Sequence, residues 1–196
     1  MSKLYKTVRH ALCGALILSG MASNGQSFSW IKNAGDNDRF TWCQGVVVDH
    51  HHNEVVCGFQ NDSTRFGSLV TPFYGDFDSY IAKYDSAGNV LWVRTIWGPD
   101  QEKIWKICVD TADNIFVTAE YSSPYIHFTA TDSMAIIAGG GNRDFFIAKY
   151  DKNGNFLWSR TGGNPVTGNK YTSAYAVTTD PAGNAIIGGY YQDTMQ

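Results

Sequence analysis

The sequence lacks a basic excess, a proline-rich stretch and any segment with helical periodicity. Its 15 lysines and arginines are outnumbered by 18 aspartates and glutamates, so the net charge is -3 at pH 7 and the electrostatic footprint of a nucleic-acid-binding protein is missing. Five prolines in 196 residues exclude a proline-rich disordered chain. No stretch after residue 25 repeats its apolar positions every 3.6 residues, so an all-β protein is predicted.

Cysteine is also scarce. One of the four cysteines, Cys13, lies in an apolar N-terminal segment, which leaves Cys43, Cys57 and Cys108. All three lie in apolar, strand-like runs, so buried and unreactive thiols are expected, with one disulfide as the alternative in an oxidising compartment. No suitably placed base favours a catalytic cysteine.

The N-terminal segment has the features of an export signal. Lys3, Lys6 and Arg9 precede the apolar stretch "ALCGALILSGMA", and small residues follow it. A membrane-spanning helix needs about 20 apolar residues, so this shorter run is predicted to be a signal peptide covering residues 1–25. We therefore expect residues 26–196 to be secreted or surface-associated, with no membrane span.

Two sequence themes recur in the rest of the chain. The stretch "IAKYDSAGNVLW", residues 81–92, returns as "IAKYDKNGNFLW" at residues 147–158. A second theme, an apolar run ending in Asp followed by a polar turn, Asn and another apolar run, appears three times, as "GVVVDHHHNEVVCGF", "KICVDTADNIFVTAE" and "AVTTDPAGNAIIGGY". Recurrence at such intervals is typical of repeat architectures.

Both themes are predicted to be β-hairpins built on the turn D-x-x-G-N. The Asp carboxylate accepts hydrogen bonds from backbone N–H groups just ahead of it, which tightens the turn. The fourth residue needs a positive φ, which favours glycine and is tolerated by His and Asp. The predicted turn residues are Asp49, His52 and Asn53; Asp85, Gly88 and Asn89; Asp110, Asp113 and Asn114; Asp151, Gly154 and Asn155; and Asp180, Gly183 and Asn184.

The strands beside these turns are apolar on both faces, which is typical of sheets covered on both sides. With no helix to cover them, other sheets must do so. Each repeat then forms a four-stranded antiparallel sheet that packs face to face on its neighbours, the blade of a β-propeller. Blade joins are expected near residues 30–92, 92–158 and 158–196.

The predicted ring is incomplete. Propellers close with about four to eight blades, whereas this chain offers about two and a half. Trp30, Trp92 and Trp158 recur at blade edges and are predicted to pack between blades, and Trp30 belongs to a strand whose own blade is otherwise missing. We therefore expect that the protein continues beyond residue 196 or that copies complete the ring by self-association.

The stretches "DSYIAKYDSAGNVLW", "DFFIAKYDKNGNFLW" and "AVTTDPAGNAIIGGY" resemble the bacterial seven-bladed β-propeller repeats, the SBBP repeats, from roughly residue 30 to residue 196. His52 and Asp113 depart from the pattern. The resemblance implies an exported or surface-exposed protein, and many members carry a C-terminal sorting domain for type IX secretion. It implies no particular ligand, because the ligands of such proteins are mostly unknown.

The densest group of metal-ligating residue types is His50, His51 and His52 with Asp49 and Glu54. Adjacent residues in a tight turn point in different directions, whereas metal sites usually draw ligands from separated positions, so a solvated turn is expected. The acidic stretches "GDNDRF" and "GDFDSY" lack the glycine and closing glutamate of an EF-hand loop. No metal site is therefore predicted.

Catalytic motifs are not recognisable. The sequence has no G-x-S-x-G motif, and turns account for its recurrent aspartates better than a nucleophile–base pair or paired carboxylates would. We predict a non-enzymatic binding or scaffolding protein without a cofactor, whose partner is a protein or a glycan. The alternative is a fragment of a propeller enzyme, either a quinoprotein-like oxidoreductase or a glycan-active enzyme.

Ligands of propellers usually meet the loops at one end of the channel. The connections between hairpins, Ser63 to Phe77 and Ser122 to Arg143, are therefore the predicted contact region. Phe73, Tyr74 and Tyr125 lie in these connections and are predicted to stack on sugars.

Overall fold

The computed structural model describes residues 32, 34, 40–135, 143–162 and 171–191. These ranges contain 14 β-strands and no helix. The predicted all-β fold is therefore confirmed.

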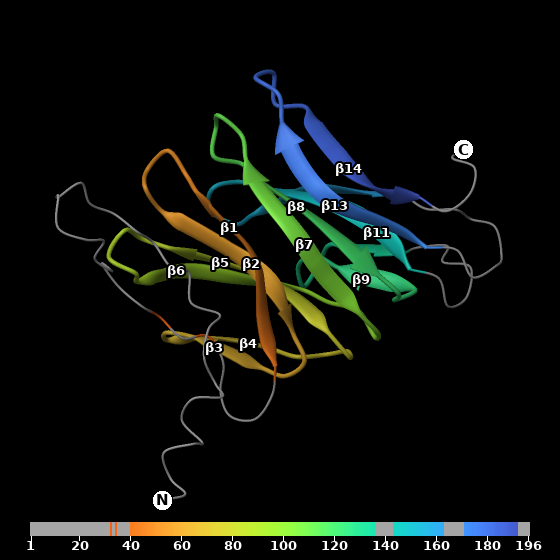
Figure 1. The fold of residues 1–196 in the computed structure, drawn as a ribbon. Helices are drawn as coiled ribbons and strands as arrows, with labels where there is room; N and C mark the ends of the chain where they lie inside the picture. Colours follow the sequence, from red (N-terminus) through yellow and green to blue (C-terminus); the bar gives the residue numbers. More distant parts are fainter. Residues whose placement is uncertain (1–31, 33, 35–39, 136–142, 163–170, 192–196) are drawn as a thin grey trace, which may run out of the picture.

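Eight of the strands form two four-stranded antiparallel sheets of the same topology, blade 1 and blade 2 (Figure 1). Blade 1 has the order β1-β2-β5-β6 and blade 2 the order β7-β8-β11-β12, as predicted for two consecutive hairpins per repeat. The strands are β1 (Thr41–Val48), β2 (Glu54–Gln60), β5 (Asp78–Tyr84) and β6 (Val90–Ile96), then β7 (Glu102–Val109), β8 (Ile115–Tyr121), β11 (Asp144–Tyr150) and β12 (Phe156–Gly162).

A third sheet consists of one hairpin, β13 (Thr172–Thr179) and β14 (Ala185–Tyr191). The first strands of the three sheets lie side by side, with β7 between β1 and β13 (Figure 1). Consecutive propeller blades have this arrangement around their common axis. The described strands make partial propeller blades and leave the ring open.

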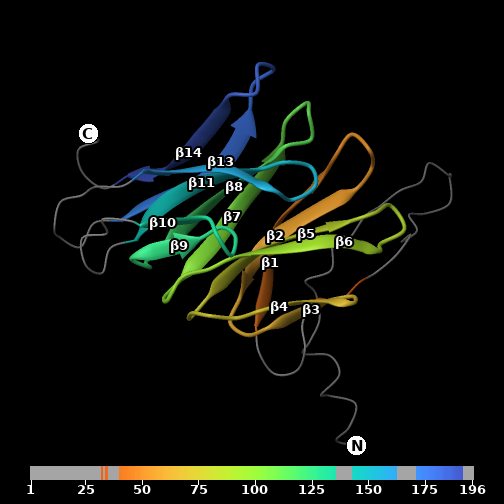
Figure 2. The ribbon, with the colours of Figure 1, turned by 180° about the vertical axis from the view of Figure 1, so that it is seen from behind.

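Each complete blade also carries a short hairpin between its second and third strands, which can be followed from behind in Figure 2. The sequence did not predict these hairpins, because strands of three residues are too short to show a period. The pairs are β3 (Thr64–Phe66) with β4 (Leu69–Thr71) and β9 (Tyr125–His127) with β10 (Ser133–Ala135).

The apolar core lies mainly between the two blades. The second strands, β2 and β8, are buried along all seven of their residues, which fits sheets covered on both faces. One cluster joins Cys57 of β2 and Ile81 of β5 to Ile104 of β7 and Val117 of β8. Blades 1 and 2 therefore share one core and stabilise each other.

The short hairpins close the outer faces of the blades. Phe66 and Phe128 are fully buried. The ring centroid of Phe66 lies 4.8 Å from that of Tyr80, and that of Phe128 lies 4.9 Å from that of Phe156. Each inserted hairpin is thus anchored by one aromatic side chain on its own blade.

Every first strand has a β-bulge at its fourth residue. In the register with the second strand, one residue of each first strand has no partner. These residues are Gln44 in β1, Trp105 in β7 and Tyr175 in β13. A bulged residue is unpaired and its side chain is re-aimed. The rings of Trp105 and Tyr175 lie 6.1 Å apart, so the bulges bring aromatic side chains of neighbouring first strands together.

The three described cysteines form no disulfide. Cys57 is fully buried, and burial raises the pKa of Cys108 to about 11, so both are unreactive thiols. No helix in the described ranges is long and apolar enough to cross a membrane. The predicted signal peptide and Trp30 lie outside the described residues.

Candidate functional site

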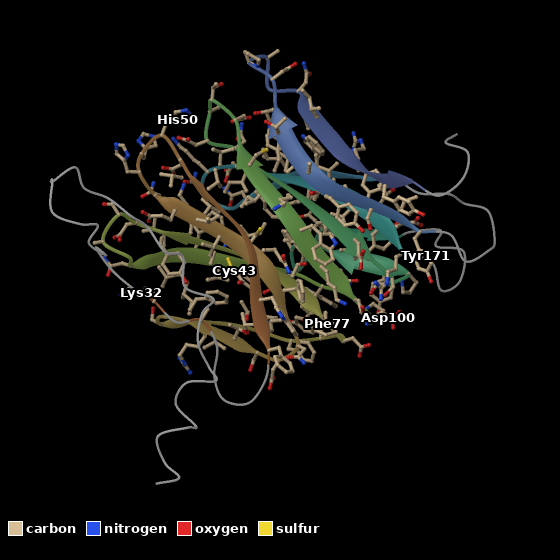
Figure 3. All side chains as sticks on the ribbon, in the orientation of Figure 1. Lys32, Cys43, His50, Phe77, Asp100 and Tyr171 are labelled. Atoms are coloured by element: carbon tan, nitrogen blue, oxygen red, sulfur yellow. The ribbon has the colours of Figure 1, made fainter. Side chains whose placement is uncertain are left out.

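The two ends of the sheets carry different side chains. One end, the turn end, holds His50, and the other, the connection end, holds Phe77, Asp100 and Tyr171 (Figure 3). Because neighbouring strands are antiparallel, all hairpin turns of the blades fall at the turn end. The links within and between blades fall at the connection end.

All five hairpin turns share one hydrogen-bond pattern. The Asp Oδ1 atom accepts the backbone N–H groups of the residues two and four positions ahead, and Oδ2 accepts the side-chain amide of the Asn, all at 2.8–3.0 Å. The fourth residue has a positive φ, between 62° and 80°, in each turn. The Asn amide explains why Asn recurs, which the sequence alone did not reveal.

The lysine of the recurrent "AKYD" also contacts a turn. Lys83 Nζ lies 2.7 Å from Asp49 Oδ2, and Lys149 Nζ lies 3.3 Å from Asp110 Oδ2. Burial by itself would raise the pKa of Asp49, but the hydrogen bonds from Lys83, Asn53 and the turn amides lower it to about 2. In each complete blade the second hairpin, β5–β6 or β11–β12, is thus ion-paired to the turn of the first hairpin, β1–β2 or β7–β8.

The outer turn of blade 2 packs on blade 1. A Cβ built on Gly154 would lie 3.0 Å from the Trp92 indole, so the turn backbone rests directly on this ring. Arg94 Nε donates to the Gly154 carbonyl at 2.7 Å, and Lys83 Nζ donates to the Lys152 carbonyl at 3.0 Å. These contacts place Trp92 between the blades.

Trp158, the counterpart of Trp92, lies beside Phe116 with ring centroids 6.0 Å apart. Its neighbour Arg160 lies over the Trp158 ring, 5.8 Å from the centroid. The same relation holds for Arg94 and Trp92, at 5.3 Å. The Trp–Arg pair is therefore a repeated feature of the outermost strand.

The histidine turn touches the next blade. His50 Nδ1 lies 2.6 Å and His51 Nε2 3.5 Å from the Asp113 carboxylate, and the His50 backbone N–H also donates to it. Asp113 thus has a role beyond tolerating a positive φ, because it links the turns of blades 1 and 2. Among the residues that the structure describes, no group of three or more His, Cys, Asp or Glu side chains is arranged to hold a metal ion.

The connection end carries a stack of aromatic rings, which we name the rim stack: Tyr74, Trp97, His127 and Tyr125. The centroid of the Trp97 ring lies 4.1 Å from that of Tyr74 and 3.9 Å from that of His127, and the Trp97 ring is nearly parallel to both. The Tyr125 ring meets the His127 ring edge-on, with centroids 5.5 Å apart. Trp97 and His127 exchange two backbone hydrogen bonds. Tyr74 and Tyr125 remain 53% and 43% exposed, so the stack presents ring surface to solvent from a rigid base.

Two of the predicted sugar-contact residues, Tyr74 and Tyr125, belong to the rim stack, and the third, Phe73, is half-buried. Trp97 and His127 were missed. Neither lies in a repeated motif, and only the pairing of the link after β6 with β9 brings them together.

A second aromatic group lines the first strands near the axis. Trp42 stacks on Phe40 and lies tilted against Phe59, at centroid distances of 5.0 and 4.9 Å. Lys103 Nζ lies 4.2 Å from the centroid of the Phe77 ring. Burial lowers the pKa of Lys103. The connection end is therefore rich in aromatic side chains from its rim to its axis.

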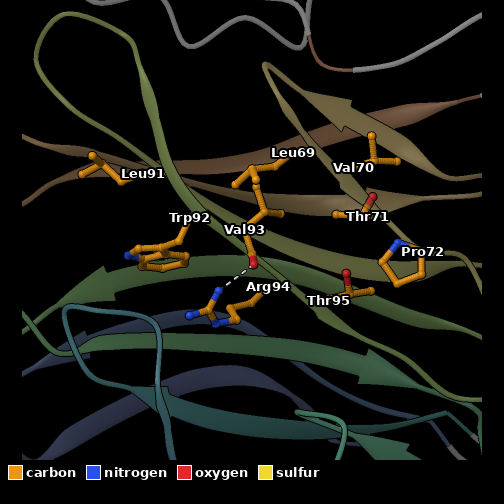
Figure 4. A pocket seen from close by; sticks show the side chains of 9 residues that line it. All are labelled: Leu69, Val70, Thr71, Pro72, Leu91, Trp92, Val93, Arg94 and Thr95. Carbon is orange, nitrogen blue, oxygen red and sulfur yellow. Dashed lines mark hydrogen bonds between the residues drawn. The ribbon is translucent and has the colours of Figure 1, made fainter.

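A groove of about 360 Å³ lies elsewhere, on the outer side of blade 1 between β4 and β6 (Figure 4). Its lining is polar and apolar in about equal measure, with Leu69, Val70 and Leu91 exposed. Arg94 lines it too, but the guanidinium already donates to Val93 and to the blade 2 turn. The groove therefore offers shape and apolar surface without an unoccupied polar group from Arg94.

No family model matches the sequence. A WD repeat-containing protein of Acanthamoeba polyphaga mimivirus, itself described as uncharacterized, is 26% identical over 158 residues. The match covers 74% of this chain but 11% of the relative. Together with the partial blades, this distant likeness indicates a repeat-built, propeller-type β protein.

Proposed function

We propose that this protein is an exported β-propeller scaffold of the SBBP type that binds its partner at the connection end. The repeat-built blades and the distant WD repeat-containing relative support a binding scaffold. The leader-like residues 1–25 support export to the surface or the medium. The role is binding and not catalysis.

The observation that carries the binding site is the rim stack. Tyr74 and Tyr125 expose ring surface, while Trp97 and His127 hold them in place from below. Rigid, amphipathic aromatic side chains are favoured at binding surfaces because they bury area at little entropic cost. A glycan whose pyranose rings stack on the two tyrosines is the ligand proposed here.

A glycan array probed with the intact protein tests this proposal. We expect binding that Tyr74→Ala and Tyr125→Ala each weaken about tenfold or more, as for central aromatic contacts. Leu157→Ala is the control, because Leu157 on β12 is 47% exposed but lies outside the rim stack. Binding that survives both rim substitutions, or a blank array, would count against the glycan site.

We further propose that more blades complete the ring, from a longer chain or from other copies. The second strands β2 and β8 are fully buried, whereas Ile186, Ile187 and Tyr190 of their counterpart β14 are exposed. Mass spectrometry of the native product, with sedimentation analysis, tests this. A monomer of about 22 kDa or less would contradict it.

A further inference from the structure

Two carboxyl groups are buried together where blade 1 meets blade 2. Asp78 begins β5 and Glu102 begins β7, and both side chains are 0% exposed. The Glu102 backbone N–H donates to the Phe77 carbonyl at 2.8 Å, and the Ser79 hydroxyl donates to the Glu102 carbonyl at 2.9 Å. The residues on either side of Asp78 therefore hold Glu102 against it.

Most of the oxygen atoms of this pair lack a hydrogen bond of good geometry. Asp78 Oδ2 accepts the Tyr74 N–H at 2.7 Å. Asp78 Oδ1 and both Glu102 Oε atoms have no hydrogen-bond partner of good geometry among the described residues. Buried ionised carboxylates without such partners are strongly destabilising.

No cation of the described residues is among the groups that act most on the two carboxyls. Glu102 faces Asp78 of β5, Asp100 and the Gly98 amide of the link between blades, and the Ser123 hydroxyl that follows β8. The adjacent Lys103 directs its Nζ over Phe77 instead. Among the described residues, the charged side chains that act most on Glu102 are therefore two acidic ones, Asp78 and Asp100.

At the junction between blade 2 and the β13–β14 hairpin, a hydroxyl group stands where blade 2 has the Glu102 carboxyl. Thr172, the first residue of β13, occupies the place of Glu102, since its N–H donates to the Arg143 carbonyl at 2.9 Å as that of Glu102 does to Phe77. The Thr172 hydroxyl donates to Asp144 Oδ1 at 3.0 Å. Asp144 begins β11 as Asp78 begins β5, so Glu102 can copy this hydrogen bond only by carrying a proton.

We propose that Asp78 and Glu102 share one proton and act as a pH-sensitive clamp between blades 1 and 2. In the clamped state the protonated carboxyl group of one residue donates a hydrogen bond to the carboxylate of the other. This bond corresponds to the one from Thr172 to Asp144 at the next junction. Loss of the proton leaves two buried anions facing each other and loosens the junction.

The pKa values of both carboxyl groups are raised, which favours a bound proton. Burial, with repulsion from Asp78 and Asp100, raises the pKa of Glu102 to about 8, although Ser123 and the Gly98 amide oppose the rise. Burial raises the pKa of Asp78 to about 6. Both pKa values are higher in the folded protein than in the unfolded chain. The contribution of the pair to stability is therefore complete below about pH 4, decreases as the second proton leaves near pH 6, and is lost as the shared proton leaves near pH 8.

Urea unfolding of the intact protein between pH 5 and 8.5 tests the clamp. One extra proton in the folded state corresponds to a fall in midpoint of about 0.5 M per pH unit. Glu102→Thr, which installs the pair seen at the next junction, should remove most of this fall. Thr172→Glu should introduce a similar fall, and parallel pH profiles for wild type and Glu102→Thr would overturn the proposal.

A second variant, hydrogen exchange and added cations also test the shared proton. Glu102→Gln, nearly the same size and always a donor, replaces Glu102→Thr if the latter does not fold, and it too should flatten the profile. Hydrogen exchange at the Glu102 and Ile104 amides, which bond to Phe77 and to the Ser79 hydroxyl, should quicken above pH 8 beyond the intrinsic rise and only in wild type. Stabilisation of wild type by Ca²⁺ or Na⁺, absent in Glu102→Gln, would identify a cation site and overturn the shared proton.

Discussion

The junction between blades 1 and 2 and the junction between blade 2 and the β13–β14 hairpin use the same backbone frame with different side chains. At the connection end the first pairs Asp78 with Glu102, and the second pairs Asp144 with Thr172. At the turn end the fourth residue is Asp113 in β7–β8 and Gly183 in β13–β14. Asp113 reaches back to His50. The repeat thus preserves turns and strands, while each junction is tuned by a few polar residues.

The largest difference between turns concerns Gly154 and Gly183. Both have a positive φ, but a Cβ on Gly154 would meet the Trp92 ring at 3.0 Å, whereas the nearest atom to one on Gly183 lies at 4.0 Å. We expect Gly154→Ala to lower the free energy of unfolding by about 3 kcal/mol, from strain and overpacking, and Gly183→Ala by about 1 kcal/mol, from strain alone.

Urea unfolding followed by tryptophan fluorescence measures both changes. The Gly154→Ala variant should also show a shift in native-state emission, because the substituted turn displaces Trp92. Equal losses for the two variants would mean that the turn of blade 2 does not bear on Trp92.

The two lysine–aspartate pairs differ in burial and distance. Lys83 and Asp49 are almost fully buried at 2.7 Å, while Lys149 is 16% exposed and 3.3 Å from Asp110. Removing one partner of a buried pair leaves an uncompensated charge, which costs about 3 kcal/mol or more. We therefore expect Lys83→Met to lower the free energy of unfolding by about 3 kcal/mol and Lys149→Met by a smaller amount.

Acid titration sharpens this comparison. The pKa of Asp49 is lowered to about 2 in the folded protein, so its contribution is present above about pH 4 and is lost as the pH falls toward 2. Lys83→Met should be less stable at pH 6 and lose less stability between pH 4 and 2. An unchanged acid limb of the profile would argue against the ion pair.

The smallest effect is expected at the histidine turn. Asp113→Gly removes the contact with His50 but relieves the positive φ, so we expect a net change within about 0.5 kcal/mol. His50→Ala removes the imidazole contact but keeps the backbone N–H bond to Asp113, and without relief of the positive φ it should cost up to about 1 kcal/mol. If Asp113→Gly proves the more damaging of the two, the His50 backbone N–H bond and the His51 contact, which only this variant loses, outweigh the relief of the positive φ.

Local patterns in the sequence predicted much of the architecture. Asp, Asn and the fourth residue of each turn are close in sequence, so Asp85, Gly88 and Asn89 suffice to indicate a hairpin without any tertiary information. Strands that are apolar on both faces, without a helix to cover them, indicated stacked sheets. The residues that act across blades were harder to predict, since Trp97 and His127 are paired only by strands distant in the chain.

The sequence by itself determined the hairpin turns, the four-stranded repeat and its apolar faces, because these depend on neighbouring residues and on a periodic pattern. Tertiary structure alone decided that the "AKYD" lysines reach Asp49 and Asp110, that Tyr74 and Tyr125 share one stack, and that Glu102 replaces a threonine beside a buried aspartate. Each of these relations joins residues from different hairpins. Their strength depends on distance and burial, which exist only once the blades have packed.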